Sequence, residues 1–440
     1  MADALPAPSQ PLPAAHAFPL GPDPGAASPP LAVPPTPAEP RLARIASTFA
    51  AGRVVRTVSP LGNGNINTTY RVELAEGESF VLQRLNTAVF PQPRQVMANL
   101  LVVGRHVEGR LRQAPSAPRE DALAGAGLGA DRGGGAGAEE RRWVFPRVLR
   151  NASGDPWLEE EGNFWRALHF VPGTISLDVL ETPSQAREVG YGLGRFHELL
   201  HDLPCHQLAD TLEGFHITPR YLAAYHALLR AVDPPAVSGP LDDSRRLGAD
   251  REREAWAHQF VAQREALAGV LEAAKAAGDL PLRPIHGDPK VNNVLLDARG
   301  GQAIALVDLD TVKPGLVLYD IGDCLRSACN PLGEETPSPE RVCFDLELCA
   351  ALLEGYGAAA GHVLSPADHV HLFDAIRLIS FELGLRFFSD HLAGNVYFHT
   401  DRPGHNLDRA LVQFHLAASI EAQEREIRGL LGRLREGRWG

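Results

Sequence analysis

The chain has 440 residues, of which 44% are hydrophobic, so it is long enough to form two or three domains or lobes with buried cores. Its formal net charge at pH 7 is −12, which argues against nucleic acid or an acidic membrane surface as its main partner, because a negatively charged protein has no general attraction to either. The five cysteines form no C-x-x-C pair, and their odd number is typical of free thiols in a reducing compartment, not of a disulfide framework or a zinc site.

The N-terminal region contains neither the basic start nor the apolar run of a secretory signal. Residues 1–40 are dominated by proline and alanine and cannot bury enough apolar surface to offset their conformational entropy, so we expect a disordered head. No uninterrupted apolar run in the sequence reaches about 18 residues, the length that a membrane-spanning helix needs. The sequence therefore predicts a cytoplasmic protein without a membrane span.

The segment after this head predicts a small, strand-rich lobe. Residues 41–50 have the spacing of a short amphipathic helix. Residues 54–85 follow in the order strand, Gly/Asn loop, strand, turn, strand. Residues 92–111 have helical spacing, and apolar strands return at 142–150 and 164–173.

A glycine-rich stretch interrupts this lobe at residues 113–142. Such a run is easily mistaken for a nucleotide-binding loop, but here no strand precedes it and no helix follows it. We therefore interpret it as a flexible surface insertion. With this insertion, the N-lobe is expected to span residues 41–172.

The second part of the chain is predicted to be mainly helical. Apolar residues recur at three- and four-residue spacing over residues 184–203, 220–232 and 251–278, and again toward the end of the chain. A short strand-rich section at residues 284–312 interrupts these helices. A strand-rich front and a helix-rich back indicate an α+β fold with two lobes instead of an alternating βαβ sheet, with the C-lobe at residues 173–440.

The most informative stretch for chemistry is residues 285–311. Asp288 comes directly after a turn, Asn293 lies five residues later, and a predicted β-hairpin ends on Asp308 and Asp310. Carboxylate and amide oxygens suit Mg²⁺, which is commonly shared with substrate phosphates. Phosphoryl transfer also needs a carboxylate that accepts the proton of the attacking hydroxyl. The pattern therefore predicts Asp288 as the catalytic base, with Asn293 and Asp308 as metal ligands.

The pattern H-G-D-x-x-x-x-N, followed by an apolar strand that ends in D-x-D, is similar to the signature of the aminoglycoside phosphotransferase and choline kinase superfamily. The resemblance implies a two-lobed, protein-kinase-like fold with a small antiparallel-sheet N-lobe and a larger, mainly helical C-lobe. It also implies ATP and Mg²⁺ as cofactors. The alternative is that Asp288 and Asp308 only form turns, but this leaves the spacing of Asn293 unexplained. For His286, the resemblance implies a structural role through a backbone hydrogen bond.

Two further segments resemble the nucleotide-binding parts of this superfamily. Gly62, Asn63 and Gly64 lie in a strand–loop–strand segment that resembles the cover over the nucleotide phosphates, although Asn-Gly between strands is by itself typical of a hairpin turn. Phe170 and Val171 follow the strand that resembles the last one before the hinge, whose backbone would bind adenine.

The third strand of the N-lobe departs from the superfamily pattern. In the common register, Gln83 stands where a lysine usually contacts the α- and β-phosphates, and Arg84 is the cation beside it. Strand alternation alone does not decide which of the two faces ATP. The phosphate contact is therefore neutral through Gln83 or ionic through Arg84.

Several stretches resemble one subgroup, the N-acetylhexosamine 1-kinases. They run from about residue 60 to residue 410 and include GNINTTY, FVLQRLNTAVF, GFHITPRY, VDLDTVKPGLVLYDIGD and FELGLRFFSDHLAGNVYFHTDRPGHNLDRA. The resemblance implies phosphoryl transfer from ATP to the anomeric hydroxyl of N-acetylglucosamine or N-acetylgalactosamine. The small-molecule sugar would then be the partner, with neither nucleic acid nor membrane involved.

In the acceptor region we expect Arg386 to contact the sugar, with Tyr397 as a neighbour, because a guanidinium offers several donors in a fixed geometry. The alternative for Arg386 is an ion pair with Asp390 one turn later. Asp310 has two open roles, support of the metal site and substrate binding. Asp320 and Asp323 are expected to be structural, and we place them under the hairpin and at the start of the next helix.

Two other functions remain open from the sequence. The same fold could phosphorylate an amino alcohol or an aminoglycoside, which would need an acidic or aromatic acceptor site. A non-catalytic, pseudokinase-like binding protein is the other alternative, which the unusual Gln83 favours and the intact Asp288, Asn293 and Asp308 oppose.

Overall fold

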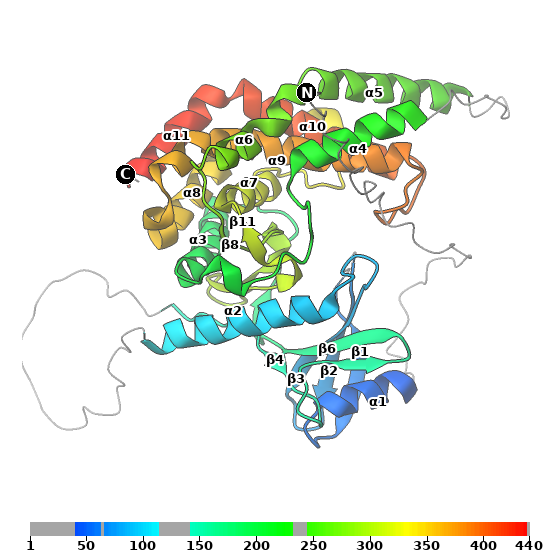
Figure 1. Ribbon diagram of the computed structural model, residues 1–440, viewed down its shortest axis with the longest axis vertical. Helices are drawn as coiled ribbons and strands as arrows, with labels where there is room; N and C mark the ends of the chain where they lie inside the picture. The colour runs from blue at the N-terminus through cyan, green and yellow to red at the C-terminus, as the bar shows by residue number, and fades with distance from the viewer. Residues whose placement is uncertain (1–39, 63–65, 114–140, 232–243, 438–440) are drawn as a thin grey trace, which may run out of the picture.

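A computed structural model describes residues 40–62, 66–113, 141–231 and 244–437. An antiparallel sheet with two helices forms one lobe, and the mainly helical remainder forms the other (Figure 1). We call the elements from α1 to β6 the N-lobe and those from β7 onward the C-lobe. The α+β, two-lobed class expected from the sequence is confirmed.

The N-lobe sheet is antiparallel and has the strand order β1-β2-β3-β6-β4, with β5 paired to β6. Its strands are β1 (Val55–Pro60), β2 (Thr68–Leu74), β3 (Ser79–Leu85), β4 (Val148–Leu149), β5 (Leu158–Glu160) and β6 (Asn163–His169). Phe80 and Leu82 of β3 are buried in a small core under α1. Because side chains alternate along a strand, Gln83 lies on the opposite face, directly across from Arg166 of β6.

The two N-lobe helices have different surroundings. Helix α1 (Pro40–Phe49) buries its apolar face against the outer face of the sheet. Helix α2 (Pro93–Gln113) contributes its apolar residues to the main core that the C-lobe helices also form. The side-chain amide of Asn99 in α2 donates to the carbonyl oxygens of Ala209 and Val312 at 2.8 and 2.9 Å, so α2 is bonded to the C-lobe backbone.

The C-lobe is built around closely packed helices. They are α3 (Pro183–Leu200), α4 (Thr218–Ala231), α5 (Ser244–Ala262), α6 (Val270–Ala276), α7 (Val317–Ala328), α8 (Leu346–Ala360), α9 (Pro366–Leu392), α10 (His405–Ala422) and α11 (Glu424–Glu436). Its short 3₁₀ helices are η2 (Cys205–Gln207), η3 (Glu265–Gly269), η4 (Val291–Asn293), η5 (Leu309–Thr311), η6 (Pro339–Arg341) and η7 (Gly361–Val363). Helices α3 and α8 touch through their backbones: a Cβ atom on Gly190 would lie 2.0 Å from the carbonyl oxygen of Leu352. Any side chain at Gly190 would therefore push these helices apart.

Two small sheets lie within the helical lobe. One has the order β10-β9-β7 and the other pairs β11 with β8. Their strands are β7 (Thr174–Ile175), β8 (Arg283–Ile285), β9 (Val294–Asp297), β10 (Ala303–Leu306) and β11 (Lys313–Gly315). Strands β9 and β10 are antiparallel and form the hairpin predicted within residues 285–311.

The continuous helical spacing over residues 251–278 predicted one element where the structure has α5, η3 and α6. At the break, the Arg264 guanidinium pairs with Glu421 of α10 at 2.7 Å and lies 3.5 Å from the centre of the Phe260 ring. This tertiary contact lies where the helix is interrupted, and apolar spacing does not encode it.

Several expectations concern parts of the chain that the structure does not describe. The disordered head at 1–40 and the flexible insertion at 113–142 fall almost entirely outside the described residues. Across the described segments, no helix is both long and apolar enough to cross a membrane.

Candidate functional site

Residues 286–288 form a tight turn directly after β8. Gly287 has a positive φ of 88°, a conformation that residues with a side chain rarely adopt. A Cβ atom at Gly287 would also lie 2.8 Å from the carbonyl oxygen of Thr311. Only glycine therefore fits at position 287, where the backbone has a positive φ and lies against Thr311. This turn sets the direction of the Asp288 side chain.

The backbone of this turn is fully hydrogen-bonded. The N–H groups of His286 and Gly287 donate to the carboxylate of Asp320 at 2.6 and 2.8 Å, and the N–H of Asp288 donates to His286 Nδ1 at 3.2 Å. The three carbonyl oxygens each accept one bond of 2.7 Å: His286 from Thr311 Oγ1, Gly287 from His216 Nε2, and Asp288 from Asn293 Nδ2. Because the backbone fixes the turn, the carboxylate of Asp288 is not needed to hold it. That carboxylate lies 3.2 Å from the ammonium of Lys290.

His286 makes the backbone hydrogen bonds expected of a loop-holding residue. Its Nδ1 accepts from the N–H of Asp288, so its Nε2 carries the proton and donates to the carbonyl of Val307 at 2.9 Å. Burial lowers the pKa of His286, which agrees with a neutral ring. Asp320 lies in the first turn of α7, at the expected start of that helix, and from there its carboxylate holds the turn. The N-cap residue of α7 is Leu316, so Asp320 does not cap the helix.

Asp308 lies two residues after β10 in the left-handed conformation, with φ 62° and ψ 56°. Residues other than glycine seldom occupy this region, and such strain is concentrated at functional sites. The side chain reaches solvent, yet the surrounding protein reduces its hydration and, with the negative charges of Asp310 and Asp288, raises the pKa of Asp308 to about 6. The surroundings of Asp308 thus disfavour its charged form, and a bound cation would favour it.

The oxygen donors at this place fit a divalent cation that is shared with a ligand. The amide nitrogen of Asn293 donates to the turn, so its amide oxygen points away from that bond. Among the described residues, no group of three or more His, Cys, Asp or Glu side chains could hold a metal ion by itself. A cation bound by Asp308 and Asn293 would need further oxygen ligands, and Mg²⁺ usually takes them from phosphates and water.

Asp310 faces the N-lobe. Arg166 of β6 donates from Nε and Nη2 to the amide oxygen of Gln83 at 2.9 and 2.7 Å, and its Nη2 lies 2.5 Å from Asp310. The side-chain amide of Asn67, just before β2, donates to the other oxygen of Asp310 at 2.6 Å. Arg166 and Asp310 are 1% and 2% exposed, so these contacts favour the supporting role of Asp310.

Of the two residues left open on β3, Gln83 lies on the face toward Asp310, and Arg84 does not. Arg84 is exposed and donates to the hydroxyl of Thr68 at 3.1 Å. The N-lobe cation that reaches Asp310 therefore comes from the neighbouring strand β6, through Arg166.

The buried pair between Arg166 and Asp310 leads to a stability prediction. Arg166→Met is expected to lower the free energy of unfolding by about 3–5 kcal/mol, because it leaves the Asp310 carboxylate buried without its partner. Urea denaturation checks this. The double variant Arg166→Met/Asp310→Leu is expected to be more stable than Arg166→Met alone, because no unpaired charge remains.

The matched control is Arg94→Met, since Arg94 forms an exposed pair with Glu159 whose side chains are 70% and 45% accessible. Exposed pairs contribute little, so the urea midpoint should hardly change. If Arg166→Met destabilises the protein no more than Arg94→Met does, the buried pair does not hold the lobes together.

The expected nucleotide loop is only partly described. Gly62 has a positive φ of 70°, as expected of a glycine in a tight loop. Asn63 and Gly64 lie outside the described residues.

The expected hinge follows β6. The ring of Phe170 packs against the guanidinium of Arg71, 4.7 Å from the ring centre. Val171 is buried against the β9–β10 hairpin, and its carbonyl accepts from Thr174 Oγ1 at 2.9 Å. This segment thus connects the N-lobe sheet directly to the hairpin that leads to Asp308.

Arg386 of α9 lies among aromatic rings. Its guanidinium carbon is 5.2, 5.2 and 5.4 Å from the ring centres of Phe215, Tyr221 and Phe398. Within the described residues, the guanidinium of Arg386 makes no hydrogen bond or salt bridge. Its donors are therefore available to a ligand, while the rings compensate part of its charge.

The alternative partner of Arg386 is engaged elsewhere. Asp390 accepts the backbone N–H groups of Val396, Tyr397 and Phe398 at 2.9, 2.8 and 2.9 Å. It thereby folds the loop after α9 so that Phe398 packs beside Arg386. Burial disfavours the charge of Arg386, but Tyr221, Tyr397, Glu382 and Asp288 outweigh burial and raise the pKa of Arg386.

Sequence reasoning missed several residues of this site. Lys290 had a local signal, because it is a cation two residues after Asp288. Arg166 had one too, as the only charged residue within the apolar stretch 164–171. His216, Tyr221 and Glu382 lie in the segments GFHITPRY and FELGLRFF, whose resemblance indicated the region but not the residues. Their partners lie far away in the sequence, so no local pattern gave their roles.

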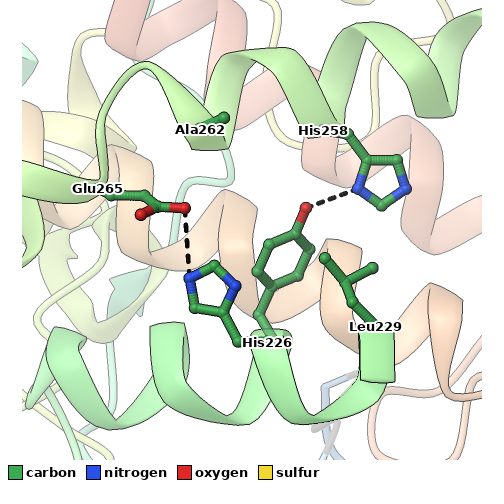
Figure 2. Close-up of a pocket in the computed structure, with 6 residues that line it drawn as sticks. His226, Leu229, His258, Ala262 and Glu265 are labelled. Carbon is green, nitrogen blue, oxygen red and sulfur yellow. Dashed lines mark hydrogen bonds and ion pairs between the residues drawn. The ribbon is translucent and has the colours of Figure 1, made fainter. Parts of the chain in front are cut away.

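A separate pocket of about 400 Å³ lies between α4 and α5 (Figure 2). It is lined by Tyr225, His226, Leu229, His258, Ala262 and Glu265. Its polar side chains bind one another. The Tyr225 hydroxyl contacts His258 at 2.6 Å, and His226 pairs with Glu265 at 3.2 Å, the second contact being marked between the labelled residues in Figure 2. This pocket contains none of the residues expected to carry chemistry.

Comparisons with known proteins agree with this arrangement. The model of the phosphotransferase enzyme family (APH) matches residues 57–368. The aminoglycoside phosphotransferase from Alicyclobacillus acidocaldarius subsp. acidocaldarius DSM 446 is 16% identical, with a TM-score of 0.50 over 91% of this chain and 97% of that one. A microcompartment-associated aminopropanol kinase is also 16% identical, with a TM-score of 0.52 over 88% and 98%. A spectinomycin phosphotransferase, solved with ADP and spectinomycin, is 12% identical, with a TM-score of 0.50 over 85% and 95%. At these identities the likeness shows a shared fold, the two-lobed kinase-like architecture.

Proposed function

The chain belongs to the phosphotransferase enzyme family, and from this premise we propose that it transfers the γ-phosphoryl group of ATP, with Mg²⁺, to the anomeric hydroxyl of an N-acetylhexosamine. The product would be the sugar 1-phosphate. The observation that carries the proposal is the guanidinium of Arg386, whose donors have no partner among the described residues. It lies one helical turn after Glu382, which His216 connects to the turn that holds Asp288.

The turn and the hairpin supply the groups that phosphoryl transfer needs. Asp288 would accept the proton of the attacking hydroxyl, and its backbone bonds keep it oriented. Asp308 and the amide oxygen of Asn293 would hold Mg²⁺, which when bound neutralises charge on the phosphates. Lys290, beside Asp288, would meet the transferred phosphoryl group with a positive charge.

The acceptor region favours a neutral, hydroxyl-rich molecule over a cation. Aminopropanol, the acceptor named for one protein of similar fold, has an amino group that is cationic at neutral pH. Such a group would be repelled by Arg386, and the rings of Tyr221 and Phe398 that could bind a cation already contact this guanidinium. Arg386 suits carbonyl and hydroxyl oxygens, such as those of an acetamido sugar.

The position of Arg166 also supports a catalytic protein over a non-catalytic one. The lack of a lysine at Gln83 does not leave this place without a cation, because Arg166 pairs with Gln83 across the strands. The carboxylate of Asp288 and the oxygen donors of Asp308 and Asn293 are all present.

A substrate panel tests the proposal. The protein is incubated with ATP and Mg²⁺ and with sugars, amino alcohols or aminoglycosides, and the products are identified by mass spectrometry. We expect phosphorylation of N-acetylglucosamine or N-acetylgalactosamine and none of their methyl glycosides, whose anomeric hydroxyl is blocked. Equal reaction of the methyl glycosides would exclude the anomeric position. Reaction of an amino alcohol alone would exclude the sugar but not the kinase.

Arg386→Ala is expected to raise the Michaelis constant for the sugar, or lower turnover, by about 10- to 100-fold, with the affinity for ATP little changed. The reason is the loss of a charge-assisted hydrogen bond, about 1.5–3 kcal/mol. Arg386→Lys should recover only part of this, because an ammonium does not reproduce the planar fork. Steady-state kinetics with each substrate varied in turn measures both effects.

The control is Arg377→Ala on the same helix, since Arg377 pairs with Asp374 at 2.8 Å. This variant should leave both Michaelis constants unchanged. A loss of ATP affinity in Arg386→Ala, with the sugar constant unaltered, would place Arg386 at the nucleotide and not at the acceptor.

A further inference from the structure

His216 lies in the loop before α4 in a constrained conformation. Its φ of 64° is in the left-handed region, and the residue is 4% exposed. The ring stacks on Tyr319 of α7, with 5.3 Å between centres and 27° between planes. A strained backbone conformation persists only where the surrounding contacts impose it, and such residues are concentrated at functional sites. His216 is therefore a candidate for a functional residue.

Both ring nitrogens of His216 face oxygen atoms. Nδ1 lies 2.9 Å from the carboxylate of Glu382, and Nε2 lies 2.7 Å from the carbonyl oxygen of Gly287. A carbonyl oxygen has no proton to give, so Nε2 must donate. The other oxygen of Glu382 accepts from the Thr218 hydroxyl at 2.6 Å, which suits an ionised carboxylate and leaves Nδ1 to donate as well. A ring that donates from both nitrogens is an imidazolium.

The charges around His216 agree with this state. Burial lowers the pKa of His216, but the carboxylates of Glu382 and Asp323 and the Gly287 carbonyl outweigh burial and raise it above its ordinary value of 6.5. The titratable and charged groups that face it are Glu382 from α9, Asp323 and Tyr319 from α7, and Tyr221 from α4. The guanidinium of Arg386 lies against the ring of the adjacent Phe215.

His216 is also the link between two parts of the site. The other partners of the turn backbone come from residues 286–320, whereas His216 is 71 residues before Gly287. Its second partner, Glu382, is on the same helix as Arg386 and one turn before it. The His216 ring therefore connects α9, the helix that carries Arg386, to Gly287, the residue directly before Asp288.

We propose that His216 is a cationic positioning residue that fixes the Gly287 carbonyl, and through it the carboxylate of Asp288, against the helix that carries Arg386. The inference rests on the proposed roles of Asp288 and Arg386. Loss of the proton removes one of the two hydrogen bonds, so the link is complete below the raised pKa and is lost as pH rises through it. The same sign holds for stability: a histidine with a raised folded pKa stabilises the fold fully below about 6.5 and loses this contribution at higher pH.

Nuclear magnetic resonance of ¹⁵N-histidine-labelled full chain tests the charge without any substrate. The signal of His216 among the 17 histidines is the one that disappears in His216→Gln. We expect both of its nitrogens to be protonated at pH 7, and we expect Glu382→Gln to lower the midpoint of its titration. A neutral His216 at pH 7, or a midpoint that Glu382→Gln leaves in place, overturns the proposal.

Two further measurements test the positioning. Amide hydrogen exchange at residues 284–292 should be faster in His216→Gln than in the wild type. In the wild type, exchange of this segment should also accelerate as pH rises through the titration midpoint of His216, by more than the general base catalysis of exchange accounts for.

With MgATP and N-acetylgalactosamine or N-acetylglucosamine, His216→Gln should lower kcat by about 10- to 100-fold, the effect of one charge-assisted hydrogen bond, with the Michaelis constant for ATP unchanged. In Glu382→Gln the alkaline fall of kcat should move to lower pH together with the His216 midpoint.

The matched control is His258→Gln, since His258 is a half-buried histidine that contacts Tyr225 in the separate pocket. It should change none of these readouts. Unchanged exchange in His216→Gln would overturn the positioning role. If the wild type phosphorylates neither sugar, the proposed acceptor is wrong, whereas the resonance and exchange data still decide whether His216 is cationic and holds the turn.

Discussion

Asp288→Asn is expected to lower kcat by about 10²- to 10⁴-fold, the contribution that a positioned base typically makes. Asparagine has the same shape but does not accept the proton of the attacking hydroxyl. The variant should still fold, because the turn is fixed by its backbone hydrogen bonds and not by the carboxylate. Turnover with MgATP and saturating acceptor, together with a thermal melt, measures both effects.

A matched control is available at the far end of the same hairpin. Asp297 accepts the backbone N–H groups of Arg299 and Gly300 in the β9–β10 turn, and asparagine keeps this ability. Asp297→Asn should therefore leave kcat unchanged. If Asp288→Asn retains wild-type turnover, or if both variants lose it equally, Asp288 is not the base.

Asp308→Asn is expected to weaken MgATP binding by more than about 100-fold, since even residues that only support metal ligands contribute about 10- to 100-fold. Calorimetry with and without Mg²⁺ measures this. Asn293→Ala should weaken binding less, because an amide does not neutralise the cation. MgATP affinity that is unchanged in Asp308→Asn would remove this residue from the metal site.

The raised pKa of Asp308 gives Asp308→Asn a second effect: the variant should be more stable than the wild type at high pH, although it binds MgATP more weakly. In the metal-free protein the folded state holds this proton more tightly than the unfolded chain does, so ionisation destabilises the fold as pH rises from about 4 through about 6. Asp308→Asn should therefore raise the melting temperature of the metal-free protein at pH 8 and not at pH 4. In the wild type, MgATP affinity should fall as pH drops below about 6, because the proton then competes with Mg²⁺ for the carboxylate.

The hairpin that carries the proposed site residues was predictable because its information is local. Asp288, Asn293 and Asp308 lie within one short segment, and their spacing is set by a turn and two paired strands. The spacing therefore determines their geometry even before the rest of the fold is known. The two-lobed class was predictable for a similar reason, since the strand and helix patterns occupy separate halves of the chain.

Contacts between distant segments were not predictable. The choice between Gln83 and Arg84 depended on which face of β3 is turned toward Asp310, and alternation alone does not give that direction. Arg166 lies 83 residues from Gln83, and His216 lies 166 residues from Glu382. Such pairs are defined by strand register and helix packing, which a single sequence does not reveal.

The hydrogen bonds of the turn at 286–288 also have a consequence for the order of folding. Its partners lie 5, 25, 33, 34 and 71 residues away along the chain. Distant contacts form only after the entropy cost of closing the intervening loops has been met, so local helices precede them. Asp288 is therefore oriented only when β8, the hairpin, α7 and the loop before α4 have all assembled. In a partly folded chain, newly synthesised or partly unfolded, the proposed base would therefore not yet be in position.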